Sequence, residues 1–268
     1  MKNIVLFDMD GTITPPRQHI EPEMQDALLE LSKIAKIGIV TGSGYDYVMQ
    51  QCGTLLKSNR DLSSFIIMPC NGTQKYIWDK SEWENDRWLK EESLDMREHI
   101  GEDNFGFLMY ALCERLHLTL MENYKKFPTT GHFISYRGSL LNWCPPGRLA
   151  TEDDRKSFIA YDKENKVRQE NLEILRKTKL SQILSFSMGG NTSIDIYPIG
   201  WDKTYALNHC NNNNVWFIGD RCTSVDGNDK PLYDKIREQN PTQAFEVKST
   251  NDTINIIDSI IAKLNNEV

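Results

Sequence analysis

Several features that would assign the chain to particular protein classes are missing from its 268 residues. No apolar run approaches the roughly 20 residues needed to cross a bilayer, so we expect no membrane anchor. Met1 and Lys2 lead directly into a short apolar segment, and we therefore expect no secretion signal. Basic blocks are also missing, and the net charge is -7. This charge argues against a nucleic-acid partner.

The six cysteines are scattered and form no Cys-x-x-Cys pair. This distribution favours reduced thiols and a cytoplasmic protein over a disulfide framework. No internal repeat is evident. Hydrophobic residues make up 39% of the chain and charged residues 26%, as in ordinary globular proteins. Length and composition therefore predict a sizeable core, either in one large domain or in a core with an inserted second domain.

Two aspartates at the end of a predicted strand are the strongest chemical signal. Residues 4–7 form an apolar run typical of a buried strand, and Asp8 and Asp10 follow it. Gly11 and Thr12 come next and are small enough to let a phosphate approach the backbone. Ligands of open α/β sheets bind at the carboxyl ends of the strands. There, one carboxylate can attack phosphorus while the other handles the proton. Their combined charge implies Mg²⁺.

A second strand end carries a phosphate-binding signal. Residues 37–40 predict a strand, and Thr41-Gly42-Ser43-Gly44 follows. Hydroxyl and backbone N–H groups at a strand-to-helix turn are a ready phosphate site. Thr41 and Ser43, with Gly42 between them, can both supply the hydroxyl, and the residues alone do not choose between them.

Strands and helices alternate at both ends of the chain. Strands are predicted at 65–68 and 215–218, and helices at 229–236 and 253–264. A parallel sheet covered by helices on both faces satisfies this order. We therefore expect a three-layer, Rossmann-like α/β core.

The middle of the chain has a different composition. Charged residues surround Trp83 and Trp88, a pair that we expect in packing or in an interface. A hairpin is predicted around Gly138, and a charged helix over 163–177. Strands interleaved with helices predict an α+β domain here. The expected organisation is a core of residues 1–80 and 198–268 with an inserted cap of residues 81–197.

Asp8-Met9-Asp10-Gly11-Thr12 after an apolar strand resembles the first motif of the haloacid dehalogenase phosphotransferases. The extension Thr14-Pro15-Pro16-Arg17-Gln18-His19-Ile20 narrows the resemblance to the eukaryotic-type phosphomannomutases. The resemblance implies that Asp8 becomes an aspartyl phosphate. Asp10 would protonate the leaving oxygen and later deprotonate the incoming hydroxyl. The mutases carry Gly-Gly-Ser at the second motif, which favours Ser43, whereas the wider superfamily matches Thr41 better.

The resemblance also gives roles to residues far from the first motif. Lys203 lies in Gly-Trp-Asp-Lys, which the mutases share, and would neutralise the aspartate and phosphoryl charges. Gly219-Asp220 and Gly227-Asn228-Asp229 resemble an acidic metal motif. The loop between them, residues 221–226, is about one residue longer than in the family. The implied Mg²⁺ ligands are Asp8, Asp10, Asp220 and Asp229.

A further set of residues resembles the family's contacts to the sugar and its distal phosphate. Two departures lie beside this set: Thr129-Thr130-Gly131 replaces Lys-Arg-Gly, and Trp143-Cys144 replaces a Val-Ser-type pair. These departures leave the preference for mannose or glucose undecided. Lys230 and Lys235 lie in the region that contributes a second, structural cation site in the family, so the presence of that site is also undecided. The implied substrate contacts are Arg17, Arg137, Arg148, Arg155, Ser193 and Asp195.

Three functions compete at this point. A phosphomannomutase would move the phosphoryl group between C1 and C6 of a hexose, with a hexose 1,6-bisphosphate as intermediate and activator. A sugar-phosphate phosphatase would form the same aspartyl phosphate but admit water. A non-catalytic sugar-phosphate binding protein is disfavoured by the intact Asp8, Asp10 and Lys203. The expected partners are small hexose phosphates, without nucleic acid or membrane, and a homodimer through the cap is an open possibility.

Overall fold

The computed structural model describes residues 1–58, 60–79, 88–211 and 213–266. The chain divides into two compact units, the first made of Met1–Ser93 and Trp201–Val268 and the second of Leu94–Gly200. Residue 80, where we expected the division, and Trp83 lie outside the described residues. None of the helices in the described ranges has the length and apolar character needed to cross a membrane.

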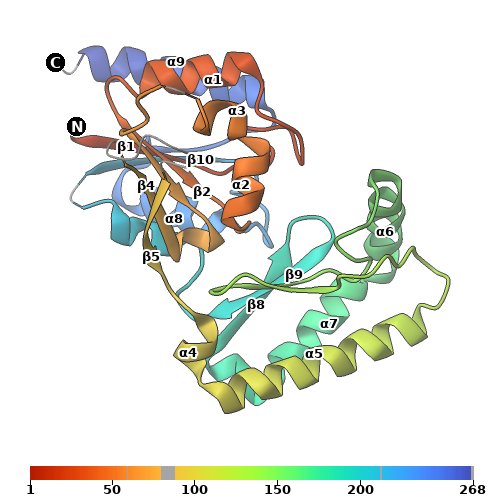
Figure 1. Ribbon diagram of the computed structural model, residues 1–268. Helices are drawn as coiled ribbons and strands as arrows, with labels where there is room; N and C mark the ends of the chain where they lie inside the picture. The colour runs from red at the N-terminus through yellow and green to blue at the C-terminus, as the bar shows by residue number, and fades with distance from the viewer. Residues whose placement is uncertain (59, 80–87, 212, 267–268) are drawn as a thin grey trace. The chain divides into compact units, whose positions relative to one another are not determined.

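A seven-stranded sheet forms the centre of the first unit (Figure 1). Its order is β11-β10-β1-β2-β3-β4-β5, and the first five strands of that order are parallel. β4 and β5 pair antiparallel at one edge, so the first unit extends to Ser93. The mainly parallel α/β core is therefore confirmed. The strands are β1 (Asn3–Phe7), β2 (Lys36–Val40), β3 (Phe65–Met68), β4 (Gln74–Trp78), β5 (Trp88–Ser93), β10 (Asn214–Gly219) and β11 (Ala244–Glu246).

Helices cover both faces of this sheet. Val5 and Phe7 of β1 point into a core with α1 (Pro22–Leu31), α2 (Tyr45–Gln51), α3 (Gly53–Leu56) and α9 (Thr250–Asn266). Ile4 and Leu6 point to the opposite face and pack with the 3-10 helix η3 (Lys203–His209) and with α8 (Lys230–Gln239). α1 and α9 lie side by side over the first face (Figure 1). Burial on both faces explains why the parallel strands read as continuous apolar runs.

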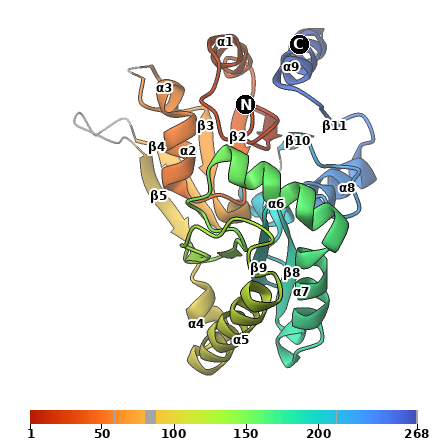
Figure 2. The same cartoon turned by 90° about the vertical axis from the view of Figure 1, so that its right-hand side faces the viewer.

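The second unit has a four-stranded antiparallel sheet in the order β6-β7-β9-β8. α7 packs against β8 and β9 and also contacts α5 (Figure 2). Strands and helices in this arrangement form an α+β unit. The strands are β6 (Ile134–Tyr136), β7 (Leu141–Trp143), β8 (Leu184–Gly189) and β9 (Ser193–Pro198), and the helices are α4 (Met96–Ile100), α5 (Glu102–Glu122), α6 (Glu152–Asn165) and α7 (Val167–Arg176).

The single helix predicted over residues 163–177 is wrong, because two helices meet there. α6 begins earlier, at Glu152, and ends at Asn165, and α7 starts at Val167. Lys166 between them has a φ of 55°, in the left-handed region that interrupts a right-handed helix. The start of α6 is fixed by a capping box between Thr151 and Asp154, which supplies partners for backbone N–H groups at the helix start.

Candidate active site

Three of the predicted site residues follow the carboxyl ends of three neighbouring parallel strands and so lie at one edge of the core sheet. Asp8 follows β1, Thr41 follows β2 and Asp220 follows β10. The N–H of Asp8 donates to the carbonyl of Ile218 at 2.9 Å, which continues the β1–β10 pairing up to the aspartate. Carboxyl ends of adjacent parallel strands are the usual ligand edge of such a sheet.

A buried lysine joins two carboxylates at this edge. Lys203 Nζ forms ion pairs with Asp8 Oδ1 and, at 2.5 Å, with Asp229 Oδ1. The side chains of Lys203 and Asp229 are completely buried. Opposing charges held at this distance away from water interact much more strongly than at a surface. The structure therefore brings together Asp8, Lys203 and Asp229, as the sequence predicted for the site.

Asp220 completes a group of three carboxylates. One oxygen each of Asp8, Asp220 and Asp229 lies within 4.8 Å of the others. Burial and the neighbouring Asp229 raise the pKa of Asp8 and raise the pKa of Asp220 to about 7. Burial lowers the pKa of Lys203, but Asp229 and Asp8 outweigh this effect and the net shift of its pKa is upward. Lys203 pairs with two of the three carboxylates, and Arg221 acts on Asp220 from nearby, so the carboxylates outnumber the positive charges around them.

These carboxylates fit a hard divalent cation. Clustered carboxylate oxygens are the donors that Mg²⁺ prefers. Burial is the main cause of the raised pKa values of Asp8 and Asp220, and the neighbouring Asp229 charge, which a cation would offset, adds to it. Gly11 gives Asp220 its space, since a Cβ on Gly11 would collide with that carboxylate. Gly11 also has a φ of 87°, which favours glycine. Asp8, Asp220 and Asp229 are the residues that could hold Mg²⁺.

The structure places the carboxylate of Asp10 outside this group of three. Its Oδ1 accepts hydrogen bonds from the backbone N–H of Arg17 at 2.9 Å and from Gln51 Nε2 at 3.2 Å. Gln51 is buried, and its Oε1 accepts a hydrogen bond from the hydroxyl of Thr14 at 2.9 Å. This second bond orients the amide so that its NH₂ group faces Asp10. Sequence reasoning missed Gln51, because no motif marks it and it lies in a different element.

The loop after β2 is held by backbone contacts. The N–H of Ser43 donates to the hydroxyl oxygen of Thr41 at 3.1 Å, and the N–H of Asn71 donates to the Thr41 carbonyl at 2.8 Å. Thr41 is buried, while Gly42 and Ser43 are half-buried. The Thr41 hydroxyl accepts within the loop and still has a hydrogen that it can donate. Both hydroxyls therefore stay candidates for a phosphate contact.

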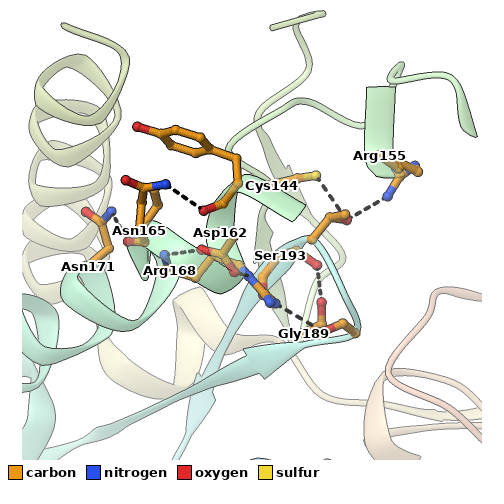
Figure 3. Close-up of polar contacts among 12 residues, drawn as sticks. Cys144, Arg155, Asp162, Asn165, Arg168, Asn171, Gly189 and Ser193 are labelled. Atoms are coloured by element: carbon orange, nitrogen blue, oxygen red, sulfur yellow. Dashed lines mark hydrogen bonds and ion pairs between the residues drawn. The ribbon is translucent and has the colours of Figure 1, made fainter. Parts of the chain in front are cut away.

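In the second unit, Asn142 links two of the predicted substrate residues. Its Nδ2 donates to Ser193 Oγ at 2.9 Å and to Asp195 Oδ1 at 2.6 Å. The Ser193 hydroxyl donates in turn to the carbonyl of Gly189 at 2.6 Å (Figure 3). Asn142 is buried in β7. From there it holds the side chains of Ser193 and Asp195, which lie on the adjacent strand β9.

Arg155 lies in the same part of the second unit. It is buried on α6, and its Nη1 donates to the hydroxyl of Thr192 at 2.6 Å (Figure 3). Arg168 forms an ion pair with Asp162 at 2.7 Å and donates to the carbonyl of Gly190 at 3.1 Å. These bonds tie the β8–β9 turn to the helices and fix the surroundings of Ser193.

The remaining predicted arginines occupy other positions. Arg137 lies in the β6–β7 turn, where its N–H donates to the carbonyl of Leu140 at 2.8 Å. Arg148 follows β7, and its N–H donates to the carbonyl of His132 at 3.1 Å. Both side chains are half-buried. Arg17 belongs to the first unit, is exposed, and has a φ of 63°.

The parallel core, its Asp-x-Asp strand end and the buried lysine among carboxylates are the features from which the sequence predicted a phosphotransferase of the haloacid dehalogenase type. The family model described as "Eukaryotic phosphomannomutase" matches residues 24–263. The chain belongs to the eukaryotic phosphomannomutase family.

Similarity to named relatives extends over nearly the whole chain. The chain is 32% identical to "Phosphomannomutase 2" of Dictyostelium discoideum in an alignment of 271 positions that covers 97% of each chain. It is also 32% identical to "Phosphomannomutase 1" of Mus musculus, covering 94% of this chain and 89% of the relative. Among solved structures, a C-terminally truncated IMP-nucleotidase of Plasmodium falciparum superposes with a TM-score of 0.63 at 13% identity, covering 97% of this chain and 71% of that chain. The last likeness concerns the fold.

Proposed function

We propose that this enzyme is a phosphomannomutase that interconverts mannose 6-phosphate and mannose 1-phosphate. The proposal rests on one observation above the others: Asp8, Lys203, Asp220 and Asp229 meet at the strand ends of the core sheet. A buried nucleophile, a fixed ammonium and a cation-binding group are what phosphoryl transfer through an aspartyl phosphate requires.

In the first half of the reaction, a carboxylate oxygen of Asp8 attacks a phosphorus of hexose 1,6-bisphosphate. The bond between that phosphorus and the sugar oxygen breaks, and Asp10 gives its proton to the leaving oxygen. The first half releases one hexose monophosphate. In the second half, the free hydroxyl of the other hexose monophosphate, the substrate isomer, attacks the aspartyl phosphate. Asp10 takes the hydroxyl proton and the bond to Asp8 breaks, which regenerates the bisphosphate and the enzyme.

The other core residues stabilise charge. Lys203 holds the Asp8 carboxylate in place and adds positive charge next to the reacting phosphoryl group. The hydroxyl of Thr41 or Ser43, with the N–H of Gly42, binds the phosphoryl oxygens. Mg²⁺ held by Asp8, Asp220 and Asp229, with Asp10 as a further candidate ligand, would supply the positive charge that the group lacks. The hydrogen bonds from Arg17 and Gln51 hold Asp10 in one orientation.

The substrate residues are proposed to bind the sugar and the phosphate that does not react. Arginine recognises phosphate through a planar fork of donors, and the serine hydroxyl and the aspartate can bond to sugar hydroxyls. A mutase needs such contacts, because its substrate has to be held at both ends. The residues in this role are Arg17, Arg137, Arg148, Arg155, Ser193 and Asp195.

We further propose a cytoplasmic homodimer. All six cysteines are free thiols, which suits a reducing compartment. α5 leaves Phe107, Tyr110 and Met121 exposed, and their spacing puts them on one face of the helix. The exposed Glu114 and His117 share this face. We propose that the three apolar side chains contact a second copy of the second unit, and sedimentation of the protein over a range of concentrations would test it.

The decisive experiment supplies mannose 1-phosphate with a catalytic amount of hexose 1,6-bisphosphate and Mg²⁺. Formation of mannose 6-phosphate without release of inorganic phosphate is expected. Stoichiometric release of inorganic phosphate would instead identify a sugar-phosphate phosphatase. Glucose 1-phosphate, tested in parallel, measures the preference for the sugar.

A further inference from the structure

The loop between Asp220 and Asp229 is fastened to the end of β11 by one carboxylate. Glu246 Oε1 accepts hydrogen bonds from the backbone N–H groups of Cys222 and Thr223 at 2.9 and 2.8 Å. Its Oε2 accepts the hydroxyl hydrogen of Thr223 at 2.6 Å. Hydrogen bonds to an ionised acceptor are roughly twice as strong as neutral ones. Glu246 is exposed; a slight loss of hydration tends to raise its pKa, and the three bonds outweigh this and lower it.

The rest of the loop is closed on itself. The N–H of Arg221 donates to Asp229 Oδ2 at 3.0 Å, and the N–H of Gly227 donates to the carbonyl of Ser224 at 3.0 Å. Gly227 is packed so tightly on the Arg221 carbonyl that a Cβ would collide with it. The loop thus has its own internal bonds, and Glu246 connects it to the neighbouring strand of the sheet.

The carboxylates of Asp220 and Asp229 repel one another and Asp8, so their approach to within 4.8 Å has to be held by the backbone around them. Lys203 balances part of this charge at Asp8 and Asp229. Asp220 lies two residues before the segment that Glu246 holds. A loop released from β11 would let Asp220 move away from the other two carboxylates.

We propose that Glu246 is a positioning residue for the cation site. By fixing Cys222 and Thr223 to β11, it keeps Asp220 and Asp229 in the arrangement that binds Mg²⁺. The inference rests on the proposed function to the extent that these aspartates bind Mg²⁺. Groups behind metal ligands typically affect metal affinity by about ten- to a hundredfold.

The test is Mg²⁺ binding to the full-length, substrate-free protein, measured by isothermal titration calorimetry. Glu246→Ala is expected to raise the dissociation constant about ten- to a hundredfold. Glu246→Gln keeps an acceptor oxygen for the two N–H groups, and we expect it to lie between the wild type and Glu246→Ala. Glu238→Ala is the matched control, because Glu238 is an exposed glutamate on α8 in the same unit; we expect wild-type binding.

A second pair of variants tests the same contact with a smaller change. Thr223→Val removes the hydroxyl bond to Oε2 and is expected to weaken Mg²⁺ binding about two- to fivefold, while Thr223→Ser keeps the hydroxyl and should bind like the wild type. This pair decides the question if Glu246→Ala does not fold. The thermal unfolding temperature of each variant is measured without Mg²⁺. If Glu246 only stabilised the fold, its loss would lower this temperature and leave the affinity for Mg²⁺ unchanged.

The outcomes separate this inference from the proposed function. Wild-type affinity in Glu246→Ala and Thr223→Val would overturn the role of Glu246 and leave the cation site standing. Failure of the wild-type protein to bind Mg²⁺ would overturn both. Weaker binding in Glu246→Ala and Thr223→Val, with the control unchanged, is the result that the structure favours.

Discussion

Replacing Lys203 by methionine tests the buried charge cluster most directly. Methionine has a similar apolar stem, so the change removes the ammonium and little of the packing volume. Lys203 is completely buried between Asp8 and Asp229. Breaking a buried ion pair by removing one partner costs about 3–5 kcal/mol, because the other charge stays buried without compensation. We expect the upper part of this range, since two carboxylates lose their partner.

The loss should depend on pH in a defined direction. In the wild type the folded-state pKa of Asp8 is raised, and that of Asp220 is raised to about 7, from the ordinary value of 3.8. The folded protein therefore binds more protons than the unfolded chain between these values, and the free energy of unfolding falls as pH rises through this window. Removing Lys203 raises both pKa values further. The loss in the free energy of unfolding caused by Lys203→Met is therefore expected to be larger at pH 8 than at pH 5.5. At the lower pH, protonation of the carboxylates relieves their repulsion.

The assay is urea unfolding of wild type and Lys203→Met in the presence of a chelator at both pH values. The control is Lys230→Met, which removes a half-exposed lysine paired with Asp234 at 2.7 Å. A surface pair of this kind contributes at most about 1 kcal/mol. A loss for Lys203→Met no larger than for Lys230→Met, or an equal loss at both pH values, would refute the argument that uncompensated carboxylates dominate the energetics here.

Four further predictions address the reaction and the thiols. Asp8→Asn should abolish turnover and spare the fold, since an amide is a poor nucleophile; activity within about tenfold of wild type, or 1.4 kcal/mol of barrier, would contradict the assignment. Asp220→Ala should raise the Mg²⁺ concentration needed for half-maximal activity, whereas Asp226→Ala, an exposed loop residue, should not. Arg148→Ala should reduce turnover of hexose 1-phosphate about ten- to a hundredfold but leave slow hydrolysis of a small aryl phosphate nearly unchanged; equal losses on both would indicate a structural role. Cys113 is the exposed cysteine among the six, so titration with a thiol reagent should modify one cysteine rapidly in the native protein and all six after unfolding.

The parallel core could be read from the sequence because its strands are buried on both faces. Residues 4–7 and 215–218 are continuous apolar runs, and such runs are a local property of the chain. The Asp8–Asp10 pair and Thr41 were recognisable for a related reason. Each follows its strand directly, and the carboxyl end of a parallel strand is where ligands bind. The family and the main features of the core were therefore determined by the sequence itself.

Other features of the site depend on contacts between segments that are distant in the sequence, and local sequence patterns do not predict such contacts. Lys203 reaches Asp8 across 195 positions of the chain, and the sequence placed it near the site only through resemblance to a family. Gln51 contacts Asp10, and Glu246 holds the loop after Asp220. No sequence motif marks either contact, because the order of strands in the sheet decides which segments become neighbours.

The tertiary structure also decided where elements begin and end. β5 pairs with β4 and extends the first unit to Ser93, although the composition changes near residue 80. Lys166 takes a left-handed conformation and separates α6 from α7, although its neighbours favour one continuous helix. At the first place the pairing of β5 with β4, and at the second the hydrogen bonds of Arg168 to Asp162 and to the carbonyl of Gly190, outweighed local preference, since the free energy of burying and pairing an element exceeds the small differences in intrinsic propensity between residues.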